Sequence, residues 1–127
     1  MDVNRLSSEI IGAALQVHRA LGPGLLESAY EACLAHELAG RGLRYERQRP
    51  VPLQYGGDVV EVGFRADLVV EDMILLELKA VDRLQPIHLA QVLTYLKLTG
   101  LQLGRLITFN VKILQHGIRR VVLGLEA

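Results

Sequence analysis

The stretch VGFRADLVVEDMILLELKA, residues 62–80, decides the fold of this chain, because it reads as two apolar strands joined at Glu71-Asp72. Three of its charged residues, Asp67, Glu77 and Lys79, are set among the apolar residues of these strands. A segment this apolar is normally buried, and a buried ion without a partner is costly. The three charges therefore need an explanation.

The spacing of these residues places them on one surface of the predicted sheet. Residues two apart in a strand share a face, so Glu77 and Lys79 project together while the neighbouring leucines pack on the opposite face. If the two strands pair antiparallel across their short turn, Asp67 falls opposite residues 76–77, within reach of Glu77. Two close carboxylates repel, and a divalent cation such as magnesium would remove that cost. The adjacent ammonium suits the holding of a water or the offsetting of charge on a phosphate.

Ordinary ion pairs are the alternative explanation for these charges. Asp67 would then pair with Arg65, and Glu77 with Lys79, at the end of a strand. Charged strand residues are mostly structural or solvated, and one such pair alone would favour this interpretation. Three charges on one face, set between apolar runs, favour a functional site instead.

Hydrophobic periodicity outlines the remaining elements. Tyr55-Gly56-Gly57-Asp58 indicates a hairpin turn, while Pro50 and Pro52 move the strand before it to a sheet edge. The helix at residues 86–99 links two predicted strands as a crossover. This order predicts one α/β domain over residues 1–127, with a mixed central sheet of about five strands flanked by helices. The predicted helices span residues 3–20, 26–38 and 86–99, and the predicted strands span 44–55, 58–70, 73–79, 103–110 and 118–124.

Composition restricts the possible functions of the chain. It has 127 residues and a formal net charge of +0, so it lacks the overall positive field of many nucleic-acid binders. The mean hydropathy of +0.26 is high for a monomer of this size and suggests a homodimer. We expect neither a transmembrane span nor a signal peptide. The single cysteine, Cys33, fits a reducing compartment and a cytoplasmic location.

Three motifs together resemble a known family. Asp67, followed after nine residues by Glu77-Leu78-Lys79, resembles the D…ExK core of the PD-(D/E)XK nuclease superfamily, with Ala66 in place of the superfamily's proline. Two further motifs narrow the resemblance. Gly24, Glu27 and Tyr30 have the spacing of the GxxExxY proteins, and Gln91 and Tyr95 have that of the QxxxY motif of helicase-associated nucleases. Near the end, Thr108-Phe109 stands where that family would have an asparagine-phenylalanine pair.

This resemblance implies a restriction-endonuclease-like core that hydrolyses phosphodiesters with Mg²⁺ or Mn²⁺. It also assigns roles to individual residues and implies a nucleic-acid partner, DNA more than RNA. The metal ligands would be Asp67, Glu77, the carbonyl of Leu78 and Glu27. Lys79 would position the nucleophile, and Gln91 would orient Lys79 or a phosphate. Tyr95, Tyr30 and Arg65 would contact the substrate, although both tyrosines also suit packing roles.

Two other functions fit the same residues. The domain could be a non-catalytic interaction module, because its neutral charge offers few cationic contacts to phosphate. It could also hydrolyse a small phosphodiester, since the same metal ligands suit any such bond.

Overall fold

The computed structural model describes residues 1–61 and 63–123 as one α/β domain. Residue 62, inside a predicted strand, and residue 124, at the end of the last one, lie outside the described residues. The helices are α1 (Val3–Leu21), α2 (Glu27–Gly40) and α3 (Pro86–Thr99), with a 3₁₀ turn at Leu114–Gly117. The strands are β1 (Tyr45–Pro50), β2 (Leu53–Tyr55), β3 (Asp58–Val60), β4 (Arg65–Val70), β5 (Ile74–Lys79), β6 (Leu103–Thr108) and β7 (Ile118–Val122).

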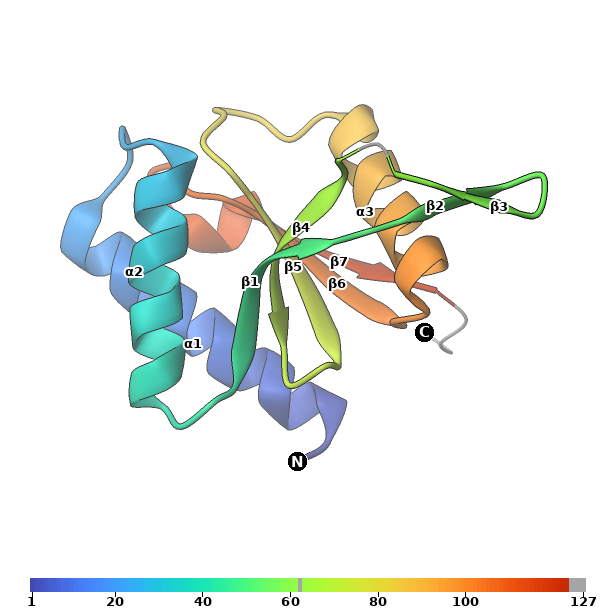
Figure 1. Ribbon diagram of the computed structural model, residues 1–127. Helices are drawn as coiled ribbons and strands as arrows, with labels where there is room; N and C mark the ends of the chain where they lie inside the picture. Colours follow the sequence, from blue (N-terminus) through green and yellow to red (C-terminus); the bar gives the residue numbers. More distant parts are fainter. Residues whose placement is uncertain (62, 124–127) are drawn as a thin grey trace.

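Five of these strands form the central sheet, in the order β1-β4-β5-β6-β7. Only β5 and β6 pair in parallel, because α3 carries the chain across between them, while the other neighbours are antiparallel. α1 and α2 lie on one face of the sheet and α3 lies on the other (Figure 1). The predicted fold class and strand number are therefore confirmed, and β1 is an edge strand as its prolines predicted.

The helices begin and end at residues whose chemistry sets those limits. The Asp2 side chain caps α1 by accepting a hydrogen bond from the Arg5 amide at 2.9 Å. Pro86 occupies the first turn of α3, and Gly100 ends that helix with a left-handed φ of 79°. Among residues 1–61 and 63–123, no helix combines the length and the apolar character needed to cross a membrane.

Two hydrophobic cores sandwich the sheet. The core beneath α1 and α2 includes Leu68, Leu76 and Leu78, whereas the core beneath α3 includes Val69 and Leu75. β5 contributes to both cores because it lies at the centre of the sheet and is covered on both faces. The alternation along β5 therefore directs Glu77 and Lys79 toward the α3 side.

Residues 71–73 join β4 to β5 through a β-turn, in which the Met73 amide donates to the Val70 carbonyl at 3.0 Å. Its central residues, Glu71 and Asp72, both have positive φ, at 52° and 53°. Aspartate tolerates this backbone region better than most residues, and paired positive φ values match the twist of a tight hairpin. The turn therefore fixes the register of β4 against β5.

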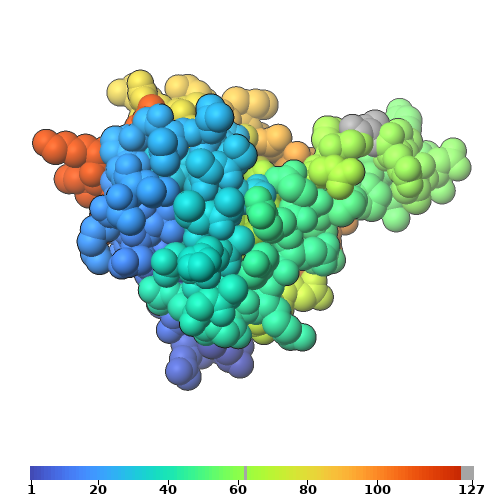
Figure 2. Space-filling model, turned by 60° about the vertical axis from the view of Figure 1, so that its left-hand side comes forward, coloured from blue at the N-terminus to red at the C-terminus, as the bar shows by residue number. Residues whose placement is uncertain are grey.

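The prediction of two long strands over 44–55 and 58–70 is wrong in one respect, because each is broken into two. β2 and β3 leave the main sheet and form a separate two-stranded hairpin, which we call the arm. The arm projects from the body of the molecule (Figures 1 and 2). Pro52 follows β1 and cannot donate a ladder hydrogen bond, and Gly63 has a left-handed φ of 77° before β4. These two positions make the breaks.

Candidate active site

The candidate site lies where β4 and β5 stop pairing. Their ladder runs from Val70–Ile74 to Leu68–Leu76 and ends there. Beyond it, carboxylates replace backbone acceptors: the Asp67 amide donates to Glu77 Oε1 at 3.2 Å, and the Leu78 amide donates to Asp67 Oδ2 at 2.8 Å. The predicted juxtaposition of Asp67 and Glu77 is therefore confirmed. Each carboxylate is held by the backbone of the other strand.

A local distortion of β1 and β4 accompanies this split. Ala66 and Val69 pack in the same core, although strict alternation would place them on opposite faces. Gln48 lies in β1 at the point opposite Asp67, where the register of the two strands skips one pair. The φ of Gln48 is 52°, a strained value for a residue other than glycine. Strain of this kind is concentrated at functional sites.

Burial makes the carboxylate pair reluctant to ionise. Glu77 is only 4% exposed, and this burial, followed by the nearby charge of Asp67, raises the pKa of Glu77 to about 8. Burial is also the main cause that raises the pKa of Asp67, with a smaller contribution from the charge of Glu31. In the metal-free protein Glu77 therefore keeps its proton near neutral pH, and the pair does not carry two negative charges.

Lys79 and two residues of α3 complete a polar line beside the pair. Lys79 Nζ donates to Gln91 Oε1 at 3.2 Å, and Gln91 Nε2 donates to the Tyr95 hydroxyl at 3.2 Å. Gln91 and Tyr95 share a helical face, as their spacing of four predicted. Burial and the charge of Glu77 raise the pKa of Tyr95, so its hydroxyl stays protonated.

The ion pairs of the alternative explanation do not form between these described residues. Arg65 donates to the carbonyl oxygen of Gln48 at 3.3 Å, and Lys79 donates to Gln91. Neither Arg65–Asp67 nor Lys79–Glu77 comes within ion-pair distance in this part of the chain. The carboxylate pair is therefore not neutralised by either of these neighbours.

Glu27 lies at the margin of the site. It begins α2, and its Oε2 accepts a hydrogen bond from the Ala80 amide at 3.2 Å, directly after Lys79. It does not join Asp67 and Glu77 in a cluster: within residues 1–61 and 63–123, no three His, Cys, Asp or Glu side chains are grouped to hold a metal ion. Glu27 thus fixes the end of β5 in this structure.

The other two predicted substrate contacts have different positions. Tyr30 is fully buried and stacks on Phe109 with ring centroids 4.4 Å apart. Its hydroxyl donates to the Gly22 carbonyl at 2.6 Å and accepts from the Leu25 amide at 3.1 Å, so it holds the α1–α2 turn. The structure does not bring Tyr30 to the site. Arg65, by contrast, is exposed at the start of β4, beside Gln48.

A second polar network reaches Asp67 from α2, and sequence reasoning missed it. Glu31 is 7% exposed and accepts hydrogen bonds from Arg47 Nε at 3.0 Å and Gln48 Nε2 at 2.6 Å. Gln48 Nε2 also donates to Asp67 Oδ1 at 3.2 Å. One amide group therefore bridges two carboxylates. The only sequence signal for Glu31 is its position one helical turn after Glu27.

This bridge predicts a measurable loss of stability when Gln48 is replaced by alanine. Alanine keeps the strained φ but removes hydrogen bonds to a buried carboxylate, so we expect about 1–2 kcal/mol of destabilisation in urea unfolding. Glycine at the same position should recover about 1 kcal/mol relative to alanine, because it accepts positive φ. Gln54→Ala in the exposed arm is the matched control. A Gln48→Ala protein as stable as the wild type would contradict the bridge.

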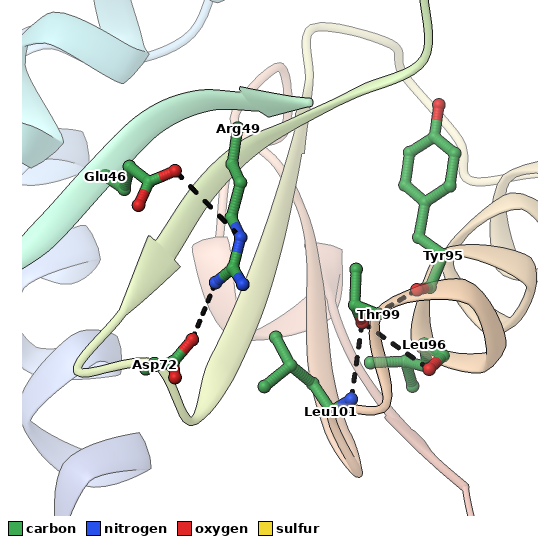
Figure 3. Close-up of polar contacts among 7 residues, drawn as sticks. All are labelled: Glu46, Arg49, Asp72, Tyr95, Leu96, Thr99 and Leu101. Carbon is green, nitrogen blue, oxygen red and sulfur yellow. Dashed lines mark hydrogen bonds and ion pairs between the residues drawn. The ribbon is translucent and has the colours of Figure 1, made fainter. Parts of the chain in front are cut away.

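An acidic and basic cluster borders the site face at the edge of the sheet. Arg49 lies between Asp72, at 2.7 Å, and Glu46, at 3.9 Å (Figure 3). The same view shows Tyr95 extending from α3, away from the Thr99 side chain that bonds the end of that helix (Figure 3). Because both partners of Arg49 are acidic, its charge is already balanced in this structure.

Comparisons with known proteins agree with this architecture. A sequence model of the PD-(D/E)XK nuclease superfamily matches residues 4–121, nearly the whole chain. Searches of curated proteins and of solved structures gave no match.

Proposed function

Because this chain belongs to the PD-(D/E)XK nuclease superfamily, we propose that it is a metal-dependent nuclease that hydrolyses phosphodiester bonds of nucleic acid. One observation carries the proposal. The Asp67 and Glu77 carboxylates resist ionising together, and Lys79 follows Glu77 on the same face of β5. Burying such a pair costs stability. A catalytic role that requires a cation explains why the cost is retained.

The residues of the site fit a hard divalent cation, Mg²⁺ or Mn²⁺. Asp67 and Glu77 offer carboxylate oxygens, the ligands that such ions prefer. The N–H and C=O groups of a strand residue point toward the same neighbouring strand. The Leu78 amide donates to Asp67 of β4, so the Leu78 carbonyl also faces β4. We propose these three groups as the ligands, with Glu27 approaching from the end of β5. A bound cation would supply Lewis acidity toward a phosphoryl group and make water a stronger acid.

Lys79 supplies the remaining positive charge. Its ammonium projects from the same face of β5 as Glu77 and is oriented by Gln91, which Tyr95 fixes in turn. An ammonium in this position holds an attacking water and offsets charge that gathers on the phosphate. Gln91 and Tyr95 therefore act on the reaction through Lys79.

We also propose that the chain belongs with the GxxExxY proteins and that DNA is its substrate. The three residues of that motif have distinct places at one end of the molecule. Gly24 has a φ of 102°, Tyr30 holds the turn after α1, and Glu27 bonds the end of β5. The motif thus links the α1–α2 turn to the strand that carries Glu77 and Lys79.

Metal binding and cleavage together test the proposed function. In calorimetry near pH 7, Mn²⁺ should bind and release protons, because a ligating Glu77 must lose the proton that its raised pKa retains. The same protein should cut a DNA strand or duplex with Mg²⁺ or Mn²⁺ and not with EDTA. Asp58→Asn, an exposed aspartate in the arm, is the matched control for metal binding.

The outcome separates this function from its alternatives. Metal-loaded protein that cuts neither DNA nor RNA would contradict the nuclease proposal. Retained binding to nucleic acid or protein would then support a non-catalytic interaction module. Turnover of a small phosphodiester without cleavage of nucleic acid would support a hydrolase of small phosphodiesters.

A further inference from the structure

A cavity of about 350 Å³ opens at the root of the arm, where the chain leaves β1 and returns to β4. Its lining combines apolar and polar groups. It contains two prolines and a valine together with an aromatic ring, an acid and a guanidinium. The lining residues are Pro50, Val51, Pro52, Glu61, Gly63, Phe64 and Arg65.

Both rims of this cavity lead directly to the candidate active site. On one rim, the Phe64 ring lies 6.1 Å from the Tyr95 ring, and Tyr95 bonds the glutamine that holds Lys79. On the other rim, Arg65 donates to the carbonyl of Gln48, whose side chain bonds Asp67. A group placed in the cavity would therefore be a near neighbour of a phosphate at the site.

The chemistry of the lining suits a nucleobase. Phe64 is 39% exposed and offers a ring for stacking. A guanidinium plane also stacks on bases, and carboxylates accept hydrogen bonds from base amino groups. We propose that this cavity binds one unpaired nucleobase of a single-stranded substrate, next to the bond that is cut. The proposal rests on the proposed nuclease function.

The charge distribution favours a single strand over a duplex. Duplex affinity depends mainly on cationic contacts to phosphate, and this chain has a net charge of +0. The sequence from residue 50 to residue 64, which contains both strands of the arm and every described lining residue except Arg65, has neither lysine nor arginine. Stacking on aromatic side chains supplies affinity for single strands independently of sequence. A base in duplex DNA could enter such a cavity only after leaving its stack.

Fluorescence anisotropy with labelled oligonucleotides in EDTA tests the cavity without any cleavage. We expect the wild type to bind a short single strand more tightly than the same sequence as duplex. Phe64→Ala should weaken single-strand binding about tenfold, the loss of one stacked base. Tyr55→Ala, at the 77% exposed aromatic of the arm tip, is the matched control and should bind within about twofold of the wild type.

An abasic version of the strand distinguishes stacking from a general loss of structure. The wild type should bind it about tenfold more weakly, whereas Phe64→Ala should not discriminate between the two strands. Phe64→Leu keeps apolar bulk against Tyr95 and covers the case in which alanine disturbs the fold. Equal binding of both strands by the wild type, or wild-type binding by Phe64→Leu and Phe64→Ala, would overturn the proposal.

This experiment fails separately from the nuclease assay. Metal-dependent cutting of duplex with no preference for single strands would end the nucleobase proposal and leave the nuclease function standing. Base-dependent binding through Phe64 without cleavage under any metal would leave the cavity assignment standing and end the nuclease function.

Discussion

Replacing Lys79 with alanine is expected to lower the rate of metal-dependent phosphodiester cleavage about a hundred- to a thousandfold. Removal of one group that stabilises developing charge typically costs an enzyme that much. Lys79 lies at the end of β5 with its ammonium held by Gln91, so it is already oriented before substrate arrives. The loss should appear in the single-turnover rate constant under saturating metal.

The Lys79 variant should remain folded and should still bind the metal. Its side chain is partly exposed and forms one hydrogen bond to another side chain, so its thermal unfolding should stay close to the wild type. Lys97→Ala removes an exposed lysine from the last turn of α3 and is the matched control. A Lys79→Ala protein that cleaves at the wild-type rate would exclude Lys79 from the chemistry.

Replacing Glu77 with glutamine is expected to stabilise the metal-free protein at pH 8 by about 2–4 kcal/mol. The folded chain holds the Glu77 proton up to about pH 8, whereas an ordinary glutamate releases it near 4.5. The folded state therefore binds more protons between these values, and wild-type stability falls as pH rises across that window. Glutamine has the same shape and a neutral charge, so it escapes this loss.

Urea unfolding in EDTA at several pH values measures this effect. The variant and the wild type should be nearly equally stable near pH 4.5 and should diverge as the pH approaches 8. Glu61→Gln, at an exposed glutamate beside the arm, is the matched control. The opposite sign, a Glu77→Gln protein less stable than the wild type at pH 8, would show that the carboxylate is held by partners that favour its charge.

Much of the fold follows from local patterns in the sequence. The β4–β5 pair is a short apolar hairpin, and its turn alone sets Asp67 opposite Glu77. The limits of α1 and α3 are equally local, since Asp2 caps the start of α1 while Pro86 and Gly100 mark the start and the end of α3. The carboxylate pair and Lys79 were predictable for this reason.

The features that sequence patterns missed depend on tertiary structure. The bridge from Gln48 to Glu31 requires a strained backbone in an edge strand and a helix packed over it, and neither leaves a periodic signal. The arm arises because each of two long predicted strands is broken into two. The alternating sequence pattern is the same whether the second part of a strand stays in the main sheet or leaves it. Tyr30 shares a motif with Glu27, but its ring faces the core because it stacks on Phe109.

The tight turn at Glu71 and Asp72 also has a consequence for the order of folding. The turn joins β4, which carries Asp67, to β5, which carries Glu77, in a hairpin of short sequence separation. Hairpins form in microseconds, whereas the parallel pairing of β5 with β6 requires α3 to cross between them first. We therefore expect the two acidic groups to meet early in folding, before Gln91 and Tyr95 are in place. Their mutual repulsion is a barrier that the nascent hairpin encounters on its own, so protons or a cation should speed the first stage of assembly.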